Sequence, residues 1–351
     1  MANILTVGID FGNSFVKAVT KDRKFVLPNF FARASEFKTD LDYIDNTGLD
    51  TYTCSEYPDE QYVWGERVYE SQRPLSTFTS EDRYTQKNYI IMVEMILAKV
   101  FEGKGKRIDV FVVTGVPAEE KETIWEADII KAFTGSHEII MNGKKIRINV
   151  VATKVLAQPI GDYMNTFLDD FGRKKDPSIK DKYIGIIDIG GGTTDLDGVY
   201  KGRPSLQMDR YTIRVGSRKA YEEIVRYIKK LYPSCRKATI ENVEKALHDN
   251  TDTFWVNAST PVDLKQIKDE AYKNLADEII SDINSYWDDR MKFDEIHLIG
   301  GSADLVAKHL KKVYGNRISF FDESQLINAN GFYKYSIIAR NLMMKEMTTE
   351  K

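Results

Sequence analysis

Four stretches of the sequence consist of a short apolar run that leads into a turn containing glycine. They are ILTVGIDFGNS (4–14), IDVFVVTGVP (108–117), YIGIIDIGGGTTD (183–195) and EIHLIGGSAD (295–304). Runs this rich in Ile and Val predict strands that are buried on both faces, as in α/β proteins. The pattern therefore favours an α/β fold.

Helical patterns follow or separate these strands. Residues 118–133 begin just after Pro117, a residue favoured in a first helical turn, and residues 303–315 end in basic residues and a glycine. Between the second and third apolar stretches we expect a further strand at 146–152 and a helix at 158–168. Two more helices are predicted at 85–101 and 332–347. The polar face of the last one carries both signs of charge, which favours packing on the first half of the chain over binding to a membrane.

The two turns that begin with an aspartate form the closest approach to an internal repeat. VGIDFGNSFVKAV and IGIIDIGGGTTDLDGV share the order apolar run, Asp, one residue, Gly, small polar cluster, apolar run, about half the chain apart. This indicates two related halves, each opening on a β-hairpin. We expect a first lobe at 1–157, with an insert at about 34–86, completed by a C-terminal helix at 328–351. The second lobe is expected at 158–327, with a mainly helical insert at about 216–292.

Length and composition fit a globular protein of the cytoplasm. The chain has 351 residues, of which 42% are hydrophobic and 29% charged, enough for one large or two ordinary domains, each with a core. The two cysteines, Cys54 and Cys235, have no CxxC spacing, which suits a reducing compartment. We expect no signal peptide, and no stretch approaches the roughly 20 apolar residues of a membrane span.

Charge and histidine spacing exclude two classes of site. The formal net charge of -3 gives no electrostatic footprint for direct nucleic-acid binding. The four histidines are scattered without ligand-like spacing, so we expect no zinc site.

The glycine-rich turns predict phosphate binding only when they are considered together. GIDFGNS alone is typical of an ordinary hairpin. Glycine lets main-chain N–H groups approach an anion closely, and Ser14, Thr193 and Thr194 add hydroxyls. Asp10 and Asp188 would repel phosphate unless Mg²⁺, which prefers carboxylate, water and phosphate oxygens, lay between. Lys17 could offset the terminal phosphates.

A glycine pair at Gly300–Gly301 completes a pattern that indicates Mg²⁺-nucleotide binding. The sequence contains no Walker A motif, and no Rossmann GxGxxG follows the first strand.

These motifs resemble those of the superfamily of actin, sugar kinases and heat-shock ATPases. VGIDFGNSFVKAV, IGIIDIGGGTTDLDGV and IHLIGGSADLV are similar to its first phosphate, second phosphate and adenosine motifs, and VVTGVP and NANGFYKYSIIA (328–339) to its two connecting segments. They occur in the family's order over nearly the whole chain. The resemblance implies a two-lobed actin-like fold, each lobe a ribonuclease-H-like mixed sheet flanked by helices, with ATP and Mg²⁺ in the cleft.

The resemblance also implies roles for individual residues. Asp10 and Asp188 match the acids that organise Mg²⁺ through its water shell. The residues that match the three nucleotide-binding motifs are Gly12, Asn13, Ser14 and Lys17 in the first, Gly190, Gly191, Gly192, Thr193 and Thr194 in the second, and Gly300, Gly301 and Ser302 in the third. ATP rather than GTP is implied by the resemblance alone, because neither the turns nor Lys17 read the base.

Two further positions take a role from the resemblance. Gln158 stands where actins place the glutamine that positions the attacking water, at the start of a connecting helix. An amide can orient water but is a poor base, so hydrolysis would depend on positioning and charge neutralisation. The stretch EEIVRYIKKLY (222–232) resembles actin's helix beside the adenine, which would place Arg226 and Lys229 near the nucleoside. The alternative is a surface helix with solvated basic residues.

Within the superfamily, the chain most resembles the bacterial actin-like ATPases of the plasmid-segregation (ParM) type. The resemblance implies ATP-dependent, head-to-tail filaments and a DNA-binding adaptor, with no direct contact to nucleic acid or membrane. A small-molecule kinase of the same superfamily is the alternative, with Asp195 or Asp162 as the catalytic carboxylate. A non-polymerising actin-like scaffold is a third possibility. No peptide-binding domain follows the ATPase motifs, which argues against a heat-shock chaperone.

Overall fold

The chain divides into two compact units, each of which is described by itself. In this computed structural model the described residues are 4–37, 48–77, 82–118, 120–121, 123–205, 209–248, 252–287 and 292–349. Unit 1 comprises Met1–Lys180 and Leu326–Lys351, and unit 2 comprises Asp181–Gln325.

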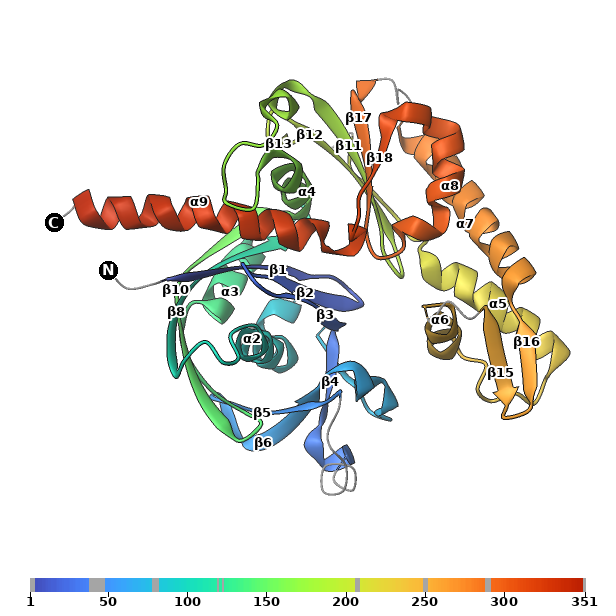
Figure 1. The fold of residues 1–351 in the computed structure, drawn as a ribbon, viewed down its shortest axis with the longest axis horizontal. Coiled ribbons are helices and arrows are strands. Elements are labelled where there is room, and N and C mark those ends of the chain that lie inside the picture. Colours follow the sequence, from blue (N-terminus) through green and yellow to red (C-terminus); the bar gives the residue numbers. More distant parts are fainter. Residues whose placement is uncertain are drawn as a thin grey trace. The chain divides into compact units, whose positions relative to one another are not determined.

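Unit 1 is built on one large mixed sheet, which Figure 1 shows curving around α2. Its strands are β1 (Leu5–Phe11), β2 (Phe15–Val19), β3 (Lys24–Pro28), β4 (Phe30–Arg33), β5 (Asp50–Cys54), β6 (Tyr57–Trp64), β7 (Leu75–Ser76), β8 (Arg107–Val116), β9 (Gly135–Met141) and β10 (Lys144–Ala157). Its helices are α2 (Lys87–Val100), α3 (Ile124–Phe133), α4 (Gln158–Phe167) and α9 (Ile327–Thr349). The strands follow the order β3-β2-β1-β8-β10-β9-β5-β6-β4-β7.

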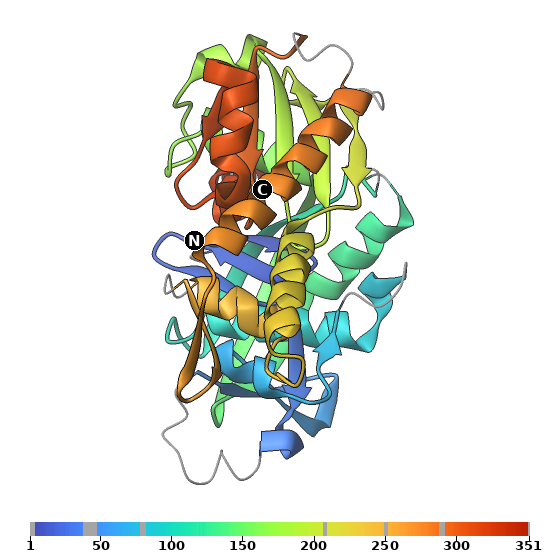
Figure 2. The same ribbon diagram turned by 90° about the vertical axis from the view of Figure 1, so that its right-hand side faces the viewer.

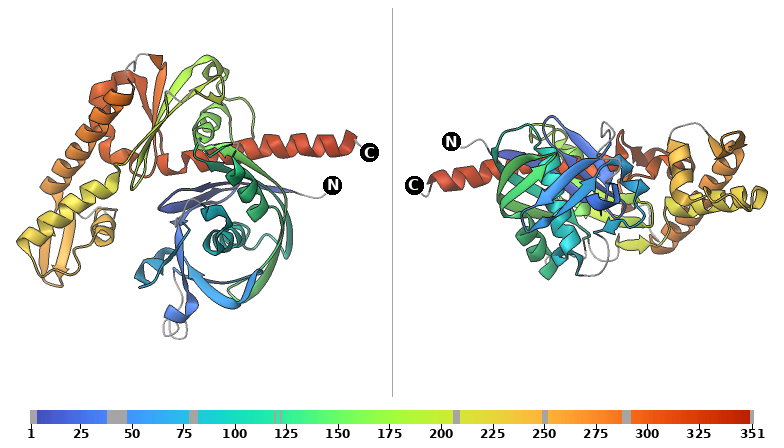
Figure 3. Two further views of the ribbon diagram at one scale, coloured as in Figure 1. Left: turned by 180° about the vertical axis from the view of Figure 1, so that it is seen from behind. Right: turned by 90° about the horizontal axis from the view of Figure 1, so that it is seen from below.

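The apolar runs of the sequence explain this core. Val7 and Ile9 of β1 and Val110 and Val112 of β8 are fully buried, and the two strands pair in parallel. Helix α2, predicted at 85–101, places its apolar residues in the same core cluster. Figure 3 shows α2 from behind and from below, inside the curve of the sheet.

Helix α9 brings the end of the chain back onto β1. Gly8 makes this possible, because a Cβ there would lie 2.2 Å from the backbone nitrogen of Tyr333. Gly331 of α9 packs equally closely on α4, where an added Cβ would lie 1.7 Å from the carbonyl oxygen of Gly161. The C-terminal helix therefore packs on the first half of the chain, as its mixed polar face predicted.

Unit 2 has a smaller mixed sheet and a mainly helical extension, which Figure 2 shows from the side. Its strands are β11 (Tyr183–Ile189), β12 (Thr194–Tyr200), β13 (Arg203–Pro204), β14 (Tyr211–Ile213), β15 (Thr253–Asn257), β16 (Thr260–Asp263), β17 (Glu295–Ile299) and β18 (Ile318–Phe320). Its helices are α5 (Ser217–Leu231), α6 (Ile240–His248), α7 (Lys265–Tyr286) and α8 (Ala303–Tyr314).

The predicted repeat is present in the strand order of the two sheets. In unit 1 the strands β3-β2-β1-β8-β10 comprise an antiparallel meander followed by two parallel strands. In unit 2 the strands β13-β12-β11-β17-β18 repeat that order and those directions. Both units are therefore α/β, with the mixed sheets of the predicted fold class.

Several expectations from the sequence differ from the observed elements. Helix α3 begins at Ile124 instead of 118, after a turn in which Glu120 is buried. The insert at 216–292 contains the hairpin β15–β16 beside its helices, and the described part of the insert at 34–86 adds strands to the main sheet. The expected boundary after residue 157 falls after 180 instead, because α4 packs against α9.

In the described parts of the chain, no helix combines the length and the apolar character that a membrane span requires.

Candidate functional site

The first hairpin places Asp10 opposite Lys17. Asp10 on β1 pairs with Lys17 on β2 in the antiparallel register, and the Lys17 Nζ lies 2.9 Å from the Asp10 Oδ2. The side chain of Asp10 is only 3% exposed and that of Lys17 14%. A carboxylate this buried needs a charged partner, and the cross-strand lysine supplies it.

Gly12 leaves room for the ammonium group of Lys17. The Gly12 N–H donates to the Phe15 carbonyl at 3.0 Å, which closes the turn. A Cβ on Gly12 would lie 2.8 Å from the Lys17 Nζ, so a larger residue would displace the ammonium group. Asn13 and Ser14 are exposed at the tip of the turn.

Gln158 lies against the same carboxylate, although it is distant in sequence. It is the first residue of α4, directly after β10, and its Nε2 donates to the Asp10 Oδ1 at 3.1 Å. Each carboxylate oxygen of Asp10 therefore accepts from a different side chain, one oxygen from Lys17 and the other from Gln158. Two residues of the first motif and a third from a distant stretch therefore meet at one point of unit 1.

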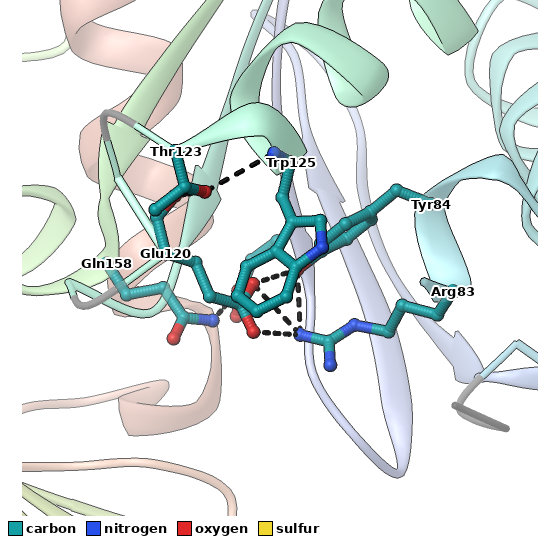
Figure 4. Close-up of polar contacts among 7 residues, drawn as sticks. Arg83, Tyr84, Glu120, Thr123, Trp125 and Gln158 are labelled. Atoms are coloured by element: carbon teal, nitrogen blue, oxygen red, sulfur yellow. Dashed lines mark hydrogen bonds and ion pairs between the residues drawn. The ribbon is translucent and has the colours of Figure 1, made fainter. Parts of the chain in front are cut away.

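A second polar cluster in unit 1 was missed by the sequence analysis. Figure 4 draws it together with Gln158. The Arg83 guanidinium donates to both carboxylate oxygens of Glu120, at 2.9 and 3.1 Å, and the Tyr84 hydroxyl donates to the same carboxylate. The Tyr84 ring lies edge-on to that of Tyr89, which contacts Phe11 of the first hairpin. A charged residue in a predicted helical turn gave no signal that it would be buried.

The second hairpin repeats the register of the first. Asp188 on β11 pairs with Asp195 on β12, and the Gly190 N–H donates to the Thr193 carbonyl at 2.9 Å. Behind the turn, the carbonyl of Gly190 accepts from the backbone N–H of Ser217 at the start of α5.

Gly216 lets α5 approach this turn, because its Cβ would lie 2.6 Å from the Gly190 carbonyl oxygen. Gly216 lies outside the glycine-rich motifs, so nothing in the sequence pointed to this contact.

The third glycine-rich turn contacts Asp188 directly. Gly300 has a φ of +99°, and a Cβ there would lie 2.4 Å from the Asp188 Oδ1. The Ser302 N–H donates to the Ile189 carbonyl at 3.0 Å, and a Cβ on Gly301 would lie 3.2 Å from the Gln325 side-chain nitrogen. The second and third motifs therefore form one continuous loop surface within unit 2.

The remaining predicted residues lie apart from these contacts or are committed elsewhere. Thr194 is fully buried, and its hydroxyl donates to the Val215 carbonyl at 2.8 Å, so its side chain supports the turn. Thr193 and Gly191 are partly exposed, and Gly192 is exposed. Arg226 and Lys229 are exposed on α5, roughly 13 and 18 Å along the helix axis from Ser217 at 1.5 Å per residue.

The donor chemistry of both hairpins fits a magnesium-bound phosphate chain. Mg²⁺ is held in proteins by one or two carboxylates together with water and phosphate oxygens. Asp10 in unit 1 and Asp188 in unit 2 each supply a carboxylate, and each stands two residues before a glycine of a turn that includes exposed residues. The buried Asp10–Lys17 pair also provides a cation that a phosphate could share.

Two sheets that share a five-strand order, each with an aspartate–glycine hairpin formed by the second and third of those strands, are typical of actin-fold proteins. Family models agree with this. The model for "Actin like proteins N terminal domain" matches residues 8–161, and that for "Archaeal actin homologue MreB-like, C-terminal" matches residues 186–312. The chain therefore carries an actin-like N-terminal domain followed by a C-terminal domain of the actin-homologue type.

Solved structures show the same fold at low sequence identity. Apo pSK41 ParM is 23% identical, with a TM-score of 0.78, over 97% of this chain and 99% of that one. ParM of Bacillus thuringiensis with ATP is 17% identical, with a TM-score of 0.73, over 97% and 100%. A 15-stranded ParM filament from Clostridium botulinum is 20% identical, with a TM-score of 0.73, over 95% and 99%. No curated protein sequence matches the chain.

Proposed function

We propose that this chain is an actin-like ATPase of the ParM type, which forms filaments in response to ATP. The observation that carries the proposal is the meeting of Lys17 and Gln158 on the two oxygens of Asp10. Purely structural hairpins do not need a buried acid, its counter-ion and an amide from a distant helix at one point. A nucleotide phosphate with its metal would use all three.

Each hairpin is proposed as a phosphate-binding element. Asp10 and Asp188 would hold Mg²⁺ through its water shell, and the bound ion would neutralise charge on the phosphates. The turn amides from Gly12 to Ser14 and from Gly190 to Thr193 would donate to phosphate oxygens. Lys17 would supply the counter-charge. The loop at 300–302, which packs on Asp188, is proposed as the adenosine loop.

Gln158 is proposed to orient the attacking water. Because a carboxylate only accepts hydrogen bonds, the contact with Asp10 assigns the Gln158 Nε2 as the donor. The amide oxygen is then the group that can accept a hydrogen bond from water. An amide fixed in this way positions a nucleophile without taking its proton, which suits slow, assembly-linked hydrolysis.

Self-association and plasmid segregation are supported by likeness of fold. The neighbouring structures include a ParM filament and ParM with ATP, and this chain covers almost their full length. The net charge of -3 favours contact with DNA through an adaptor protein over direct binding. A cytoplasmic location is proposed because the two cysteines, without CxxC spacing, suit a reducing compartment.

The structure gives little support to the kinase alternative. A catalytic base must face the acceptor hydroxyl, but Asp162 on α4 is fully buried. Asp195 accepts a hydrogen bond from the Thr212 hydroxyl at 2.6 Å. The buried Asp162 carboxylate is therefore not presented to a small substrate, whereas Asp195 is half-buried.

Nucleotide titration and turnover assays test the proposal. Isothermal titration with ATP and ADP, with and without Mg²⁺, should show magnesium-dependent binding, and ATP should be hydrolysed without any added acceptor. The Asp188→Ala variant should lose magnesium-dependent turnover. No binding of either nucleotide would contradict the proposal, as would turnover that begins only when a small hydroxyl compound is added.

A further inference from the structure

Asn29, a residue outside every motif, holds the first hairpin from behind. It lies between β3 and β4 and is only 3% exposed. Its side-chain Nδ2 donates to the Gly12 carbonyl at 2.7 Å, and its backbone N–H donates to the Ser14 carbonyl at 2.8 Å. Two carbonyls of the turn are therefore drawn to one buried residue.

The Gly12 carbonyl sets the direction of the Asn29 amide, because it can only accept a hydrogen bond, and the other end of the amide is held by Thr77. Its hydroxyl donates to the Asn29 Oδ1 at 2.5 Å, and Thr77 is itself 2% exposed. A carbonyl oxygen can only accept, so Nδ2 must face Gly12, and the hydroxyl of Thr77 satisfies the other end of the amide. If the amide flipped, the Asn29 Oδ1 and the Gly12 carbonyl oxygen would face each other, and these two acceptors would be left without a donor in a buried place.

This contact decides which way the turn presents its donors. In a planar trans peptide the C=O and N–H groups point in opposite directions. When the Gly12 carbonyl is held toward Asn29, the N–H of Asn13 in the same peptide is turned to the opposite side. Asn13 is exposed there, where an anion could accept from it.

The second hairpin holds the equivalent carbonyl with a different donor. Gly190 stands two residues after Asp188, as Gly12 does after Asp10, and its carbonyl accepts from the Ser217 N–H of α5 at 3.2 Å. Both units therefore hold the same peptide from behind, one through a side chain and the other through a helix start. The recurrence in two unrelated surroundings argues that the orientation of this peptide matters for more than local packing.

We infer that Asn29, held in place by Thr77, is a positioning residue that aims the backbone amide of the first hairpin at the β- and γ-phosphates of the nucleotide. The inference rests on the proposed function and deepens it. It predicts that loss of the contact weakens only ligands that carry phosphates beyond the first. AMP, which lacks them, serves as the internal control.

Binding of ADP and AMP to the full chain, with Mg²⁺, tests the inference. Asn29→Asp keeps the shape but replaces the donor with an acceptor, so ADP affinity should fall by about tenfold or more, the effect of one lost hydrogen bond. Thr77→Val, which keeps the shape of Thr77 without its hydroxyl, should weaken ADP binding by about threefold to tenfold. Thr77→Ser, which keeps the hydroxyl, should bind ADP with wild-type affinity. AMP affinity should stay unchanged in all three variants.

The outcomes separate this inference from the proposed function. If the wild-type chain binds no ADP, both fall. If it binds ADP and the variants bind ADP normally, or lose ADP and AMP equally, the inference alone is overturned. Thermal unfolding of each variant identifies a folding defect, and the Thr77 pair still decides the question if Asn29→Asp does not fold.

Discussion

At the scale of single residues, the proposed function depends on a small number of contacts to Asp10 in unit 1 and to Asp188 in unit 2. Asp10 is buried, yet both of its oxygens accept hydrogen bonds from residues that come from separate elements of unit 1. Asp188 is shaped instead by backbone, because Gly300 packs directly on it. The hairpin of unit 1 is therefore organised by side chains, and that of unit 2 by glycines.

Replacing Gln158 should separate hydrolysis from assembly. Gln158→Ala removes the amide that would orient water, while Asp10 keeps its ion pair with Lys17. We expect phosphate release to slow by at least about tenfold, with ATP-driven assembly intact. Phosphate release and light scattering, recorded on the same sample, measure the two effects. Assembly lost with hydrolysis unchanged would remove Gln158 from the role assigned to it.

Gly300→Ala should disturb Asp188 as well as the backbone. Alanine is strained at a φ of +99°, and its Cβ would clash with the Asp188 Oδ1. Gly315→Ala is the matched control in the same unit, since Gly315 also has a positive φ but a Cβ there would meet nothing within 4 Å. We expect Gly315→Ala to cost about 1–3 kcal/mol of backbone strain.

The steric clash should make Gly300→Ala costlier than this control by about 1–3 kcal/mol. Urea unfolding measures the difference, and only Gly300→Ala should weaken nucleotide binding. Equal costs for the two variants would show that the contact with Asp188 is unimportant.

At the scale of elements, α2 and β9 are joined by a buried acid–base pair. Glu94 of α2 and His137 of β9 are 1% and 8% exposed, and the His137 Nδ1 lies 3.3 Å from the Glu94 carboxylate. The His137 Nε2 lies 2.7 Å from the Phe133 carbonyl oxygen. Since both partners of the ring are acceptors, the charged imidazolium satisfies both contacts.

The pair should make stability depend on pH. Burial alone would lower the pKa of His137, but its hydrogen bonds to Glu94 and Phe133 outweigh burial and raise it. Burial alone would raise the pKa of Glu94, but hydrogen bonds from His137 and Ser55 lower it. Stabilisation by His137 is thus complete below its unfolded pKa of about 6.5 and is lost as pH rises through the raised folded value. Stabilisation by Glu94 is lost as pH falls below about 4.5.

Unfolding experiments across pH can isolate the histidine. We expect the free energy of unfolding of the wild type to decline as pH rises above about 6.5. His137→Gln, which does not titrate, should show a flatter profile over the same range. Parallel profiles for the two proteins would show that His137 is neutral in the folded state.

The elements themselves differ in how far the sequence could predict them. Dense Ile and Val runs identified β1, β8, β11 and β17, and helical spacing identified α2, α4 and α8, because burial on a face leaves a periodic trace. The hairpin β15–β16 was missed because its short strands lie between strongly helical stretches.

The site was predictable where it is carried by motifs. Asp10 and Lys17 were selected from the first glycine-rich stretch and Gln158 from a distant one, and the fold brings the three together. Asn29, Glu120 and Gly216 were missed, because their roles come from contacts that are distant in sequence and that no local pattern records. Thr194 was assigned to the ligand from its motif, but its side chain is buried.

At the scale of the whole molecule, two units with the same strand order form an actin-like chain. Head-to-tail contacts between copies of one chain generate an open filament when the rotation from copy to copy does not close into a ring. A nucleotide can drive assembly only if it binds the assembling conformation more tightly than the other. If the two hairpins bind phosphate as proposed, their contacts to the γ-phosphate would supply this difference in affinity between the two conformations.

The most direct test of this account is light scattering with Mg²⁺-ATP across a series of protein concentrations, with negative-stain microscopy of the same samples. With Mg²⁺-ATP we expect a critical protein concentration above which scattering rises and filaments are seen. With ADP we expect this critical concentration to be higher. Protein that binds and hydrolyses ATP but shows no rise in scattering at any concentration would contradict it.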